Sequence, residues 1–247
     1  MIPKRIHYCW FGRGDKPGLV RKCIRSWTKY CPDYEIIEWN EDNYDLSTAP
    51  LFVKQAIEAK KWAYATDYIR LKVIYDHGGI YLDTDVEVIR NMDDLLRNTA
   101  YFGFQNMRNV ATGLGFGAEK GNALLLDLMK GYEGIPFLLE DGSMNETPCP
   151  SRDLPVFQKY GLRPDGSEQY LNGNVHIYPK EYFSPLDYKT GCMKKTGQTV
   201  SIHWFAASWF SKKQLRRKRI RWIINRALGQ ERFERLKRRL KGISRKA

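Results

Sequence analysis

The spacing of apolar residues divides the start of the chain into alternating strands and helices. PKRIHYCWFG (residues 3–12) predicts a strand that ends in a glycine turn, and YEIIEW (34–39) predicts a second strand. Between them, residues 18–31 have apolar side chains at helical spacing. A strand, a helix and a strand joined by short links are typical of a parallel βαβ unit, so the pattern predicts an α/β fold.

The longest helical pattern spans residues 50–77, and we expect two helices that are broken near Lys60. Gly78 and Gly79 should end this region, because glycine accepts the left-handed cap that other residues resist. IYLDTDVEVI (80–89) then predicts a strand that runs through and past two acids.

The patterns beyond residue 99 are shorter. Strands are expected at AYFGFQ, GLGFGA and VHIYP, a helix at ALLLDLMKGYE, and loops with one short helix near DLPVFQKY between residues 140 and 174. There is no internal repeat and no clear linker before Ser211. We therefore expect a single α/β domain, a mainly parallel mixed sheet flanked by helices, over residues 1–211.

The net charge of +13 is concentrated at the end of the chain. Residues 212–247 contain sixteen Lys or Arg and two Glu, whereas residues 1–211 contain 25 basic and 26 acidic residues. Apolar residues recur at helical spacing in this segment, so we expect a basic amphipathic helical tail over 212–247. Such a helix suits an anionic membrane surface; the alternative is a helical hairpin that packs on the body with solvated arginines.

Composition also bears on location. The sequence has no run of about 18 apolar residues, and MIPKRIHYCWFG lacks the apolar stretch of a secretory signal. The five cysteines are dispersed, which favours reduced thiols over a disulfide framework. We expect a cytoplasmic protein that contacts an anionic membrane surface through its basic tail.

Asp83 and Asp85 are the first candidate chemistry. At positions i and i+2 of an extended segment, both carboxylates point to one face. Mn²⁺ and Mg²⁺ prefer such oxygen ligands, and ligands gather at the carboxyl ends of parallel strands. A divalent cation there could neutralise a departing diphosphate. The alternative is a surface turn with two solvated acids.

Three segments resemble a known family. RIHYCWFG, WAYATDYIRLKVIYDHGGIYLDTDV and HWFAASW are similar to the sugar transferases that carry the DXD motif. That group includes yeast outer-chain mannosyltransferases, bacterial capsule and O-antigen transferases and, more distantly, the glucosylating domains of large bacterial toxins. The resemblance extends over residues 1–210, is loose between 100 and 195, and implies a GT-A-type fold that binds a nucleotide sugar.

The resemblance implies roles for five residues of the central block. Asp85 would hold the metal, and Asp83 would contact the ribose or the sugar hydroxyls or reach the metal through water. Asp67 and Arg70 would hold the donor sugar, and with Asp83 they are the candidate catalytic residues. The i, i+3 spacing of Asp67 and Arg70 would also allow an ordinary surface salt bridge. Tyr81 is either a donor contact or a core aromatic.

The aromatic ends of the domain supply further candidates. By the resemblance, Trp10 stacks on the nucleobase, His203 is a metal ligand, and Ser208 and Trp209 contact the diphosphate from a segment that closes over it. The alternative for Trp10 and His203 is a place in the core. His7 lies on a strand and is expected to be a packed histidine.

Together these features predict a metal-dependent glycosyltransferase that takes its sugar from a nucleotide diphosphate sugar. The resemblance implies that the enzyme is retaining and favours UDP. The acceptor would be a saccharide bound by the loose middle part (GLGFG and ETPCPSRDLP), and the bacterial members of the family imply that it is lipid-linked at the inner face of the cell membrane, where the protein would be peripheral. The alternatives are a nucleic-acid-binding protein that uses the basic tail and a metal-dependent phosphohydrolase that uses the acidic pair. No nucleic acid is expected as a partner, because the body is close to neutral.

Overall fold

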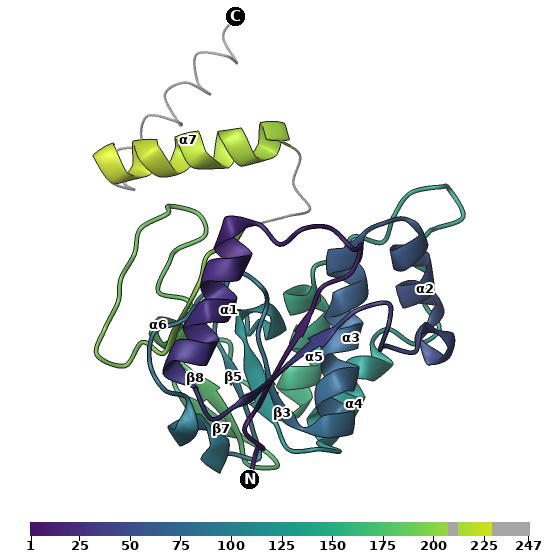
Figure 1. Ribbon diagram of the computed structural model, residues 1–247, viewed down its shortest axis with the longest axis horizontal. Helices are drawn as coiled ribbons and strands as arrows, with labels where there is room; N and C mark the ends of the chain where they lie inside the picture. Colours follow the sequence, from purple (N-terminus) through teal and green to yellow (C-terminus); the bar gives the residue numbers. More distant parts are fainter. Residues whose placement is uncertain (207–211, 229–247) are drawn as a thin grey trace, which may run out of the picture.

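A seven-stranded mixed sheet forms the centre of the computed structural model, which describes residues 1–206 and 212–228 (Figure 1). The strand order is β2-β1-β3-β6-β5-β8-β7. β2, β1, β3, β5 and β8 run in one direction, and β6 and β7 run against them. The strands are β1 (Arg5–Cys9), β2 (Glu35–Trp39), β3 (Gly79–Tyr81), β5 (Ala100–Gly103), β6 (Phe116–Ala118), β7 (Gln169–Leu171) and β8 (Val175–Tyr178). The predicted α/β fold with a mainly parallel mixed sheet is confirmed.

The first βαβ unit is as predicted. α1 (Gly18–Tyr30) connects β1 to β2, which pair in parallel from Arg5 beside Glu35 to Cys9 beside Trp39. Trp27 of α1 is fully buried, and its indole N–H donates to the carbonyl of Val86 at 2.8 Å. This contact fixes α1 against the segment that follows the two acids.

The long helical region is two helices, α2 (Leu51–Glu58) and α3 (Trp62–His77), with Lys60 at a positive φ of 55° between them. Gly78 ends α3 with a φ of 66°, and Gly79 follows with a φ of 116°. A Cβ on Gly79 would lie 2.9 Å from the carbonyl oxygen of Arg5, so a larger residue would push β3 away from β1. The predicted break and the predicted glycine stop are both confirmed.

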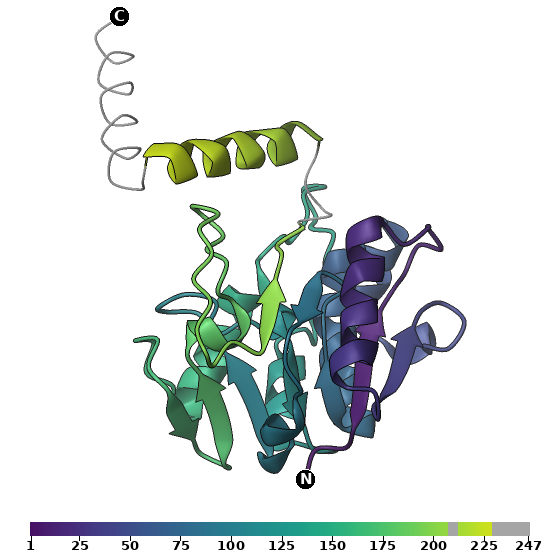
Figure 2. The ribbon, with the colours of Figure 1, turned by 60° about the vertical axis from the view of Figure 1, so that its left-hand side comes forward.

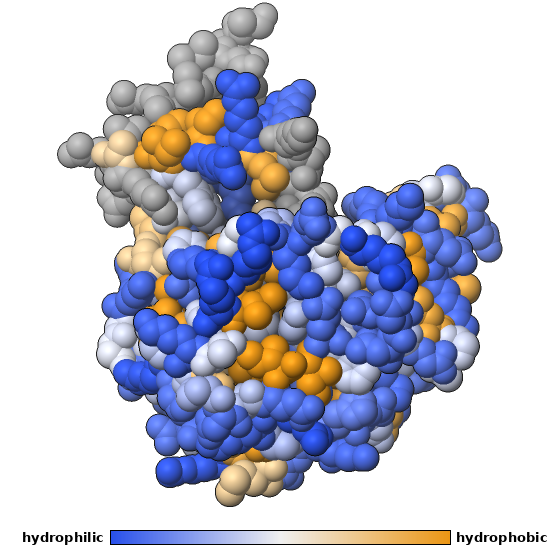
Figure 3. Space-filling view, in the orientation of Figure 1, coloured by the Kyte–Doolittle hydropathy of each residue, from blue (hydrophilic) through white to orange (hydrophobic). Residues whose placement is uncertain are grey.

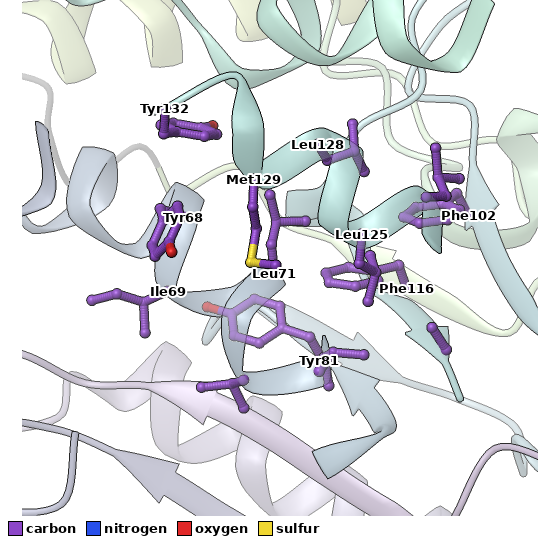
Figure 4. Close-up of a cluster of buried hydrophobic side chains, with 14 of the residues drawn as sticks. Tyr68, Ile69, Leu71, Tyr81, Phe102, Phe116, Leu125, Leu128, Met129 and Tyr132 are labelled. Carbon is purple, nitrogen blue, oxygen red and sulfur yellow. The ribbon is translucent and has the colours of Figure 1, made fainter. Parts of the chain in front are cut away.

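The inner strands β3, β6, β5 and β8 are buried on both faces of the sheet. Ile80 of β3 packs with α1 in one apolar cluster, and the next residue, Tyr81, packs with α3 and α4 (Ala123–Lys130) in another. Figure 4 shows the second cluster, in which side chains of α3 and α4 meet those of the sheet. Continuous burial on both faces is typical of strands between two helical layers.

The predicted strand over 80–89 is wrong in its continuity. β3 ends at Tyr81, and Val86–Val88 form a separate strand, β4, that pairs antiparallel with β9 (Ser201–His203) in a two-stranded sheet. Between them the chain turns, and the N–H of Val86 donates to the carbonyl of Asp83 at 2.9 Å. Aspartates favour such turns, because their side chains compete for local backbone groups.

The remaining elements follow the prediction in part. The helix at 123–130 and the short helix α5 (Cys149–Lys159) are found, whereas β7 and β9 were not predicted. GLGFGA begins with a 3-10 turn, η3 (Thr112–Leu114), before β6. The other short helices are α6 (Lys180–Phe183), η1 (Leu46–Thr48) and η2 (Asp93–Arg97).

The start of the basic tail is helical, as predicted. α7 (Lys212–Leu228) lies beyond the end of the sheet that is opposite the N-terminus (Figure 2). Its Trp222 indole donates to the carbonyl of Tyr188 at 2.9 Å. Residues 229–247 lie outside the described residues, and the domain boundary at 211 stays a prediction. Within 1–206 and 212–228, every helix is too short or too polar to cross a membrane.

Candidate active site

Asp83, Asp85 and His203 meet at the end of β3. One ligand atom from each of the three side chains lies within 4.8 Å of the other two. The pairing of Val86 with His203 in the small sheet brings His203 beside the turn, and its Nε2 is 3.1 Å from Oδ1 of Asp85. The two carboxylates therefore converge through a turn and a distant strand, and not through one continuous strand.

Asp85 is held by the segment after β9. Its Oδ2 accepts the N–H of Ala206 at 2.6 Å, and its carbonyl accepts the N–H of Trp204 at 3.0 Å. Burial raises the pKa of Asp85, but the contact with His203 and the Ala206 N–H outweigh it and hold that pKa below its ordinary value. Burial lowers the pKa of His203, and Asp85 more than offsets this, so that the net shift is upward.

This donor set fits a divalent cation. Two carboxylates and an imidazole that lie this close together are ligands that Mn²⁺ accepts. Mg²⁺ binds through one or two carboxylates plus water. Nδ1 of His203 is buried, and it has no hydrogen-bond partner among the residues that the structure describes. A buried nitrogen without a partner is costly, so the imidazole has capacity for a further contact.

Arg70 connects the acidic turn to two helices. Its guanidinium forms an ion pair with Asp67 of α3, donates to Oδ1 of Asp83 at 3.2 Å, and donates to Sγ of Cys149 in α5 at 3.2 Å. The Arg70 side chain is only 3% exposed. Arg70 is thus buried and its partner Asp67 is only 15% exposed, so this pair is not the ordinary surface salt bridge considered as an alternative.

Asp83 lies between these two groups. Burial raises its pKa above the ordinary value, although Arg70 opposes the shift. The side chain of Asp83 is 28% exposed, so part of the carboxylate faces solvent. A Cβ on Gly113 would lie 2.7 Å from Oδ2 of Asp83, so η3 can approach this carboxylate only because residue 113 is glycine.

Sequence reasoning did not find Cys149 and Gly113 as individual site residues. Both fall in segments that the sequence assigned to the acceptor side, GLGFG and ETPCPSRDLP. The structure instead places them against Arg70 and Asp83. The repeated glycines of GLGFG were the available signal for a close backbone approach. No sequence pattern indicated a site role for Cys149.

Tyr81 and His7 are buried. The Tyr81 ring is 2% exposed and lies in the cluster of Figure 4, with the Arg70 guanidinium 5.9 Å from its centroid. This burial favours the core role, and the donor contact stays a prediction. His7 accepts the Trp39 indole N–H at Nδ1, and burial lowers its pKa to about 4. It is a neutral packed histidine, as expected.

Trp10 follows β1 at the same end of the sheet as the acidic turn. Its indole N–H donates to the carbonyl of Gly14 at 2.7 Å, and the Lys16 ammonium lies 5.7 Å from its ring centroid. The ring is half-buried, and stacking on a base stays a prediction. Ser208 and Trp209 lie outside the described residues.

Comparison with known proteins identifies the central block. Residues 17–102 match the model of the glycosyltransferase sugar-binding region containing the DXD motif. This match relates residues 17–102, and not the whole chain, to that family. The matched residues include α3, Asp67, Arg70 and the DXD turn, and the resemblance stated from the sequence is confirmed.

Two curated relatives also match part of the chain. The chain is 28% identical over 143 residues to inositol phosphoceramide mannosyltransferase 3 of Schizosaccharomyces pombe, covering 55% of this chain and 38% of that protein. It is 30% identical over 121 residues to an uncharacterized glycosyltransferase of Acanthamoeba polyphaga mimivirus, covering 45% of this chain and 47% of that protein. The chain thus spans less than half the length of each relative.

Solved structures show weaker similarity. The PaToxG glycosyltransferase aligns with a TM-score of 0.49 at 16% identity, covering 64% of this chain and 68% of that one. A glycosyltransferase involved in glycosylation of the PBCV-1 major capsid aligns with a TM-score of 0.45 at 11% identity, covering 86% and 97%.

Proposed function

We propose that this protein is a metal-dependent glycosyltransferase that moves a hexose or related sugar from a nucleotide diphosphate sugar to a saccharide acceptor. The observation that carries the proposal is the double role of Asp83. It accepts from Arg70 on one side and converges with Asp85 and His203 on the other. One carboxylate of the matched family segment therefore joins a cation cluster to the buried Arg70 and its partner Asp67.

Asp85, Asp83 and His203 would hold Mn²⁺ or Mg²⁺. When bound, the cation supplies positive charge that stabilises the departing diphosphate. The protein prepares this site through Asp85, whose lowered pKa keeps the carboxylate ionised at neutral pH. The Ala206 N–H fixes one oxygen of that carboxylate and leaves the other toward His203.

Asp67, Arg70 and Asp83 would position the donor sugar. Arg70 is fixed by contacts to three separate segments, so its guanidinium needs little reorganisation when a ligand arrives. The carboxylates of Asp67 and Asp83 are partly exposed and can accept sugar hydroxyls. Trp10 would stack on the base, with UDP favoured, and Ser208 and Trp209 would contact the diphosphate.

Retention of configuration, a lipid-linked acceptor and a peripheral position at the inner face of the cell membrane belong to the same proposal. α7 supports the membrane part, because its seventeen residues include eight Lys or Arg and no acid. Ile220 and Ile223 are 45% and 65% exposed on it, and Figure 3 shows apolar and hydrophilic side chains side by side on this helix. Exposed isoleucines among cations suit an anionic interface.

A thermal-shift panel of nucleotide sugars with and without Mn²⁺ tests the proposal. A ligand that binds the native state raises Tm by mass action, so we expect donor-specific stabilisation that requires the metal. Asp85→Ala should abolish the metal dependence and keep the fold. Asp94→Ala, which removes a carboxylate that is 93% exposed, is the matched control. If no nucleotide sugar stabilises the wild type at millimolar concentration, the proposal fails.

Acceptor-dependent transfer separates this proposal from its rivals. A phosphohydrolase would release sugar phosphate or nucleotide with no gain from a saccharide acceptor. A nucleic-acid-binding protein would bind DNA or RNA with strong salt dependence, and would keep that binding in Asp85→Ala.

A further inference from the structure

A groove lies between α7 and the body of the protein. It encloses about 200 Å³. Its apolar wall is formed by side chains from α1, from the segment after β9 and from α7, namely Leu19, Trp204, Phe205, Leu215 and Trp222. Two cations, Lys218 and Arg219, also line it. The groove thus combines an apolar wall with two cations.

The groove adjoins the proposed cation cluster. Trp204 and Ala206 line the groove, and both also bond to Asp85. The Trp204 N–H donates to the backbone carbonyl of Asp85, and the Ala206 N–H donates to the Asp85 carboxylate. Figure 2 shows α7 beyond the end of the sheet that is opposite the N-terminus. A molecule in the groove would therefore lie next to the reacting groups.

Lys218 is an unusual cation. It is 6% exposed, its ammonium donates to the carbonyl of Phe205, and the rings of Tyr188 and Trp222 lie 4.9 and 4.7 Å away. Among the described residues no carboxylate forms an ion pair with it. Burial is the main cause that lowers its pKa to about 8. The Asp85 carboxylate opposes this shift from beyond ion-pair distance. A buried ammonium that forms no ion pair is costly, and a lysine ammonium has three donors to satisfy.

We propose that this groove binds a lipid phosphate, with its chain against the apolar wall and its phosphate at Lys218 and Arg219. The inference rests on the proposed function, since the lipid would be the part of the acceptor that carries the growing saccharide. A nucleotide sugar has one apolar face, that of its base, which the proposed function places on Trp10, so its ribose, diphosphate and sugar do not match five apolar wall residues. A phosphate with an attached hydrocarbon matches both the wall and the two cations.

Binding of octyl phosphate to the full chain by titration calorimetry tests the inference without nucleotide, metal or turnover. Inorganic phosphate and octanol serve as the two half-ligands, and both should bind more weakly than octyl phosphate. Lys218→Met should weaken octyl phosphate binding by about tenfold, the effect of one charge-assisted hydrogen bond. Arg219→Gln, at the exposed rim, should weaken it several-fold. Lys213→Met, an exposed lysine of the same helix outside the groove, should leave it unchanged.

Each outcome supports or contradicts the binding of a lipid phosphate in the groove. Inorganic phosphate that binds as tightly as octyl phosphate would assign the cations to a phosphate site alone. Octanol that binds equally well would assign the groove to a plain apolar patch. Unchanged binding in both Lys218→Met and Arg219→Gln would overturn the inference, and Arg219→Gln guards against misfolding of the buried variant. Arg70→Lys, at a side chain that lies outside the groove, should keep octyl phosphate binding while weakening metal-dependent donor binding, so the groove and the catalytic proposal can fail separately.

Discussion

Nη1 of Arg70 donates to Oδ1 of Asp83 at 3.2 Å across thirteen positions of sequence. The bond links the middle of α3 to the first acid of the DXD turn. Because the same guanidinium also pairs with Asp67 and contacts Cys149, it sets the relative positions of three segments. The donor-sugar side of the site is therefore built into the core, and changes there affect both stability and activity.

Arg70→Lys should lower kcat/KM for transfer by about 100-fold, because an ammonium cannot reproduce the planar set of donors that reaches three partners. Arg70→Ala should also lower the free energy of unfolding by about 3–5 kcal/mol, since two carboxylates lose their buried counter-charge. Urea unfolding and initial rates measure the two effects. Arg97→Ala, at a side chain that is 81% exposed, is the control. Full activity in Arg70→Lys would contradict the positioning role.

His203→Ala should raise the Mn²⁺ concentration needed for half-maximal binding by about tenfold or more, because the cluster loses one of three ligands. Electron paramagnetic resonance of free Mn²⁺ during a titration measures this directly. His77→Ala removes an exposed histidine on α3 and should leave the titration unchanged. Equal Mn²⁺ affinity in His203→Ala and wild type would remove His203 from the metal site.

Local patterns predicted the framework of this fold well. The βαβ unit, the break near Lys60 and the stop at Gly78 all depend on residues within one or two turns of each other, and all are found. The resemblance placed Asp67, Arg70 and the DXD pair in one block, and the structure brings them together.

The failures come from contacts between distant segments. The strand through Asp83 and Asp85 is broken because β4 pairs with β9, more than a hundred residues later in the chain. Neither the alternation of apolar residues nor the strand propensity of residues 80–89 identifies β9 as the partner strand. Cys149 likewise reaches Arg70 only through the packing of α5 against α4, which its own sequence does not specify.

Gly113→Ala should disrupt the site more than the fold. The new Cβ would lie 2.7 Å from Oδ2 of Asp83 and 3.3 Å from Nη1 of Arg70, so either η3 or the Asp83–Arg70 pair must move. We expect kcat/KM to fall by about 100-fold, as for other displacements of about 1 Å at a reacting centre. Gly18→Ala, where a Cβ meets nothing within 4 Å, is the matched control. Metal-dependent donor binding and circular dichroism would separate a displaced site from a lost fold.

Asp153 gives a prediction for the pH dependence of stability. Both of its carboxylate oxygens are buried and lack hydrogen-bond partners within the described part of the chain. Burial raises its pKa from 3.8 to about 7, although Arg70 and Arg152 oppose the shift. The folded state then binds more protons than the unfolded state between about pH 4 and 7, so this residue makes the free energy of unfolding fall as pH rises through that window.

Asp153→Asn should remove this dependence, because an amide of the same shape stays neutral. We expect the variant to match wild type near pH 4 and to be more stable at pH 8, by at most about 4 kcal/mol at 1.36 kcal/mol per pKa unit. Urea unfolding at both pH values measures the difference. Asp94→Asn, at an exposed carboxylate, should show no such change. A variant that is less stable than wild type at pH 8 would mean that the Asp153 carboxylate is ionised and paired in the native protein.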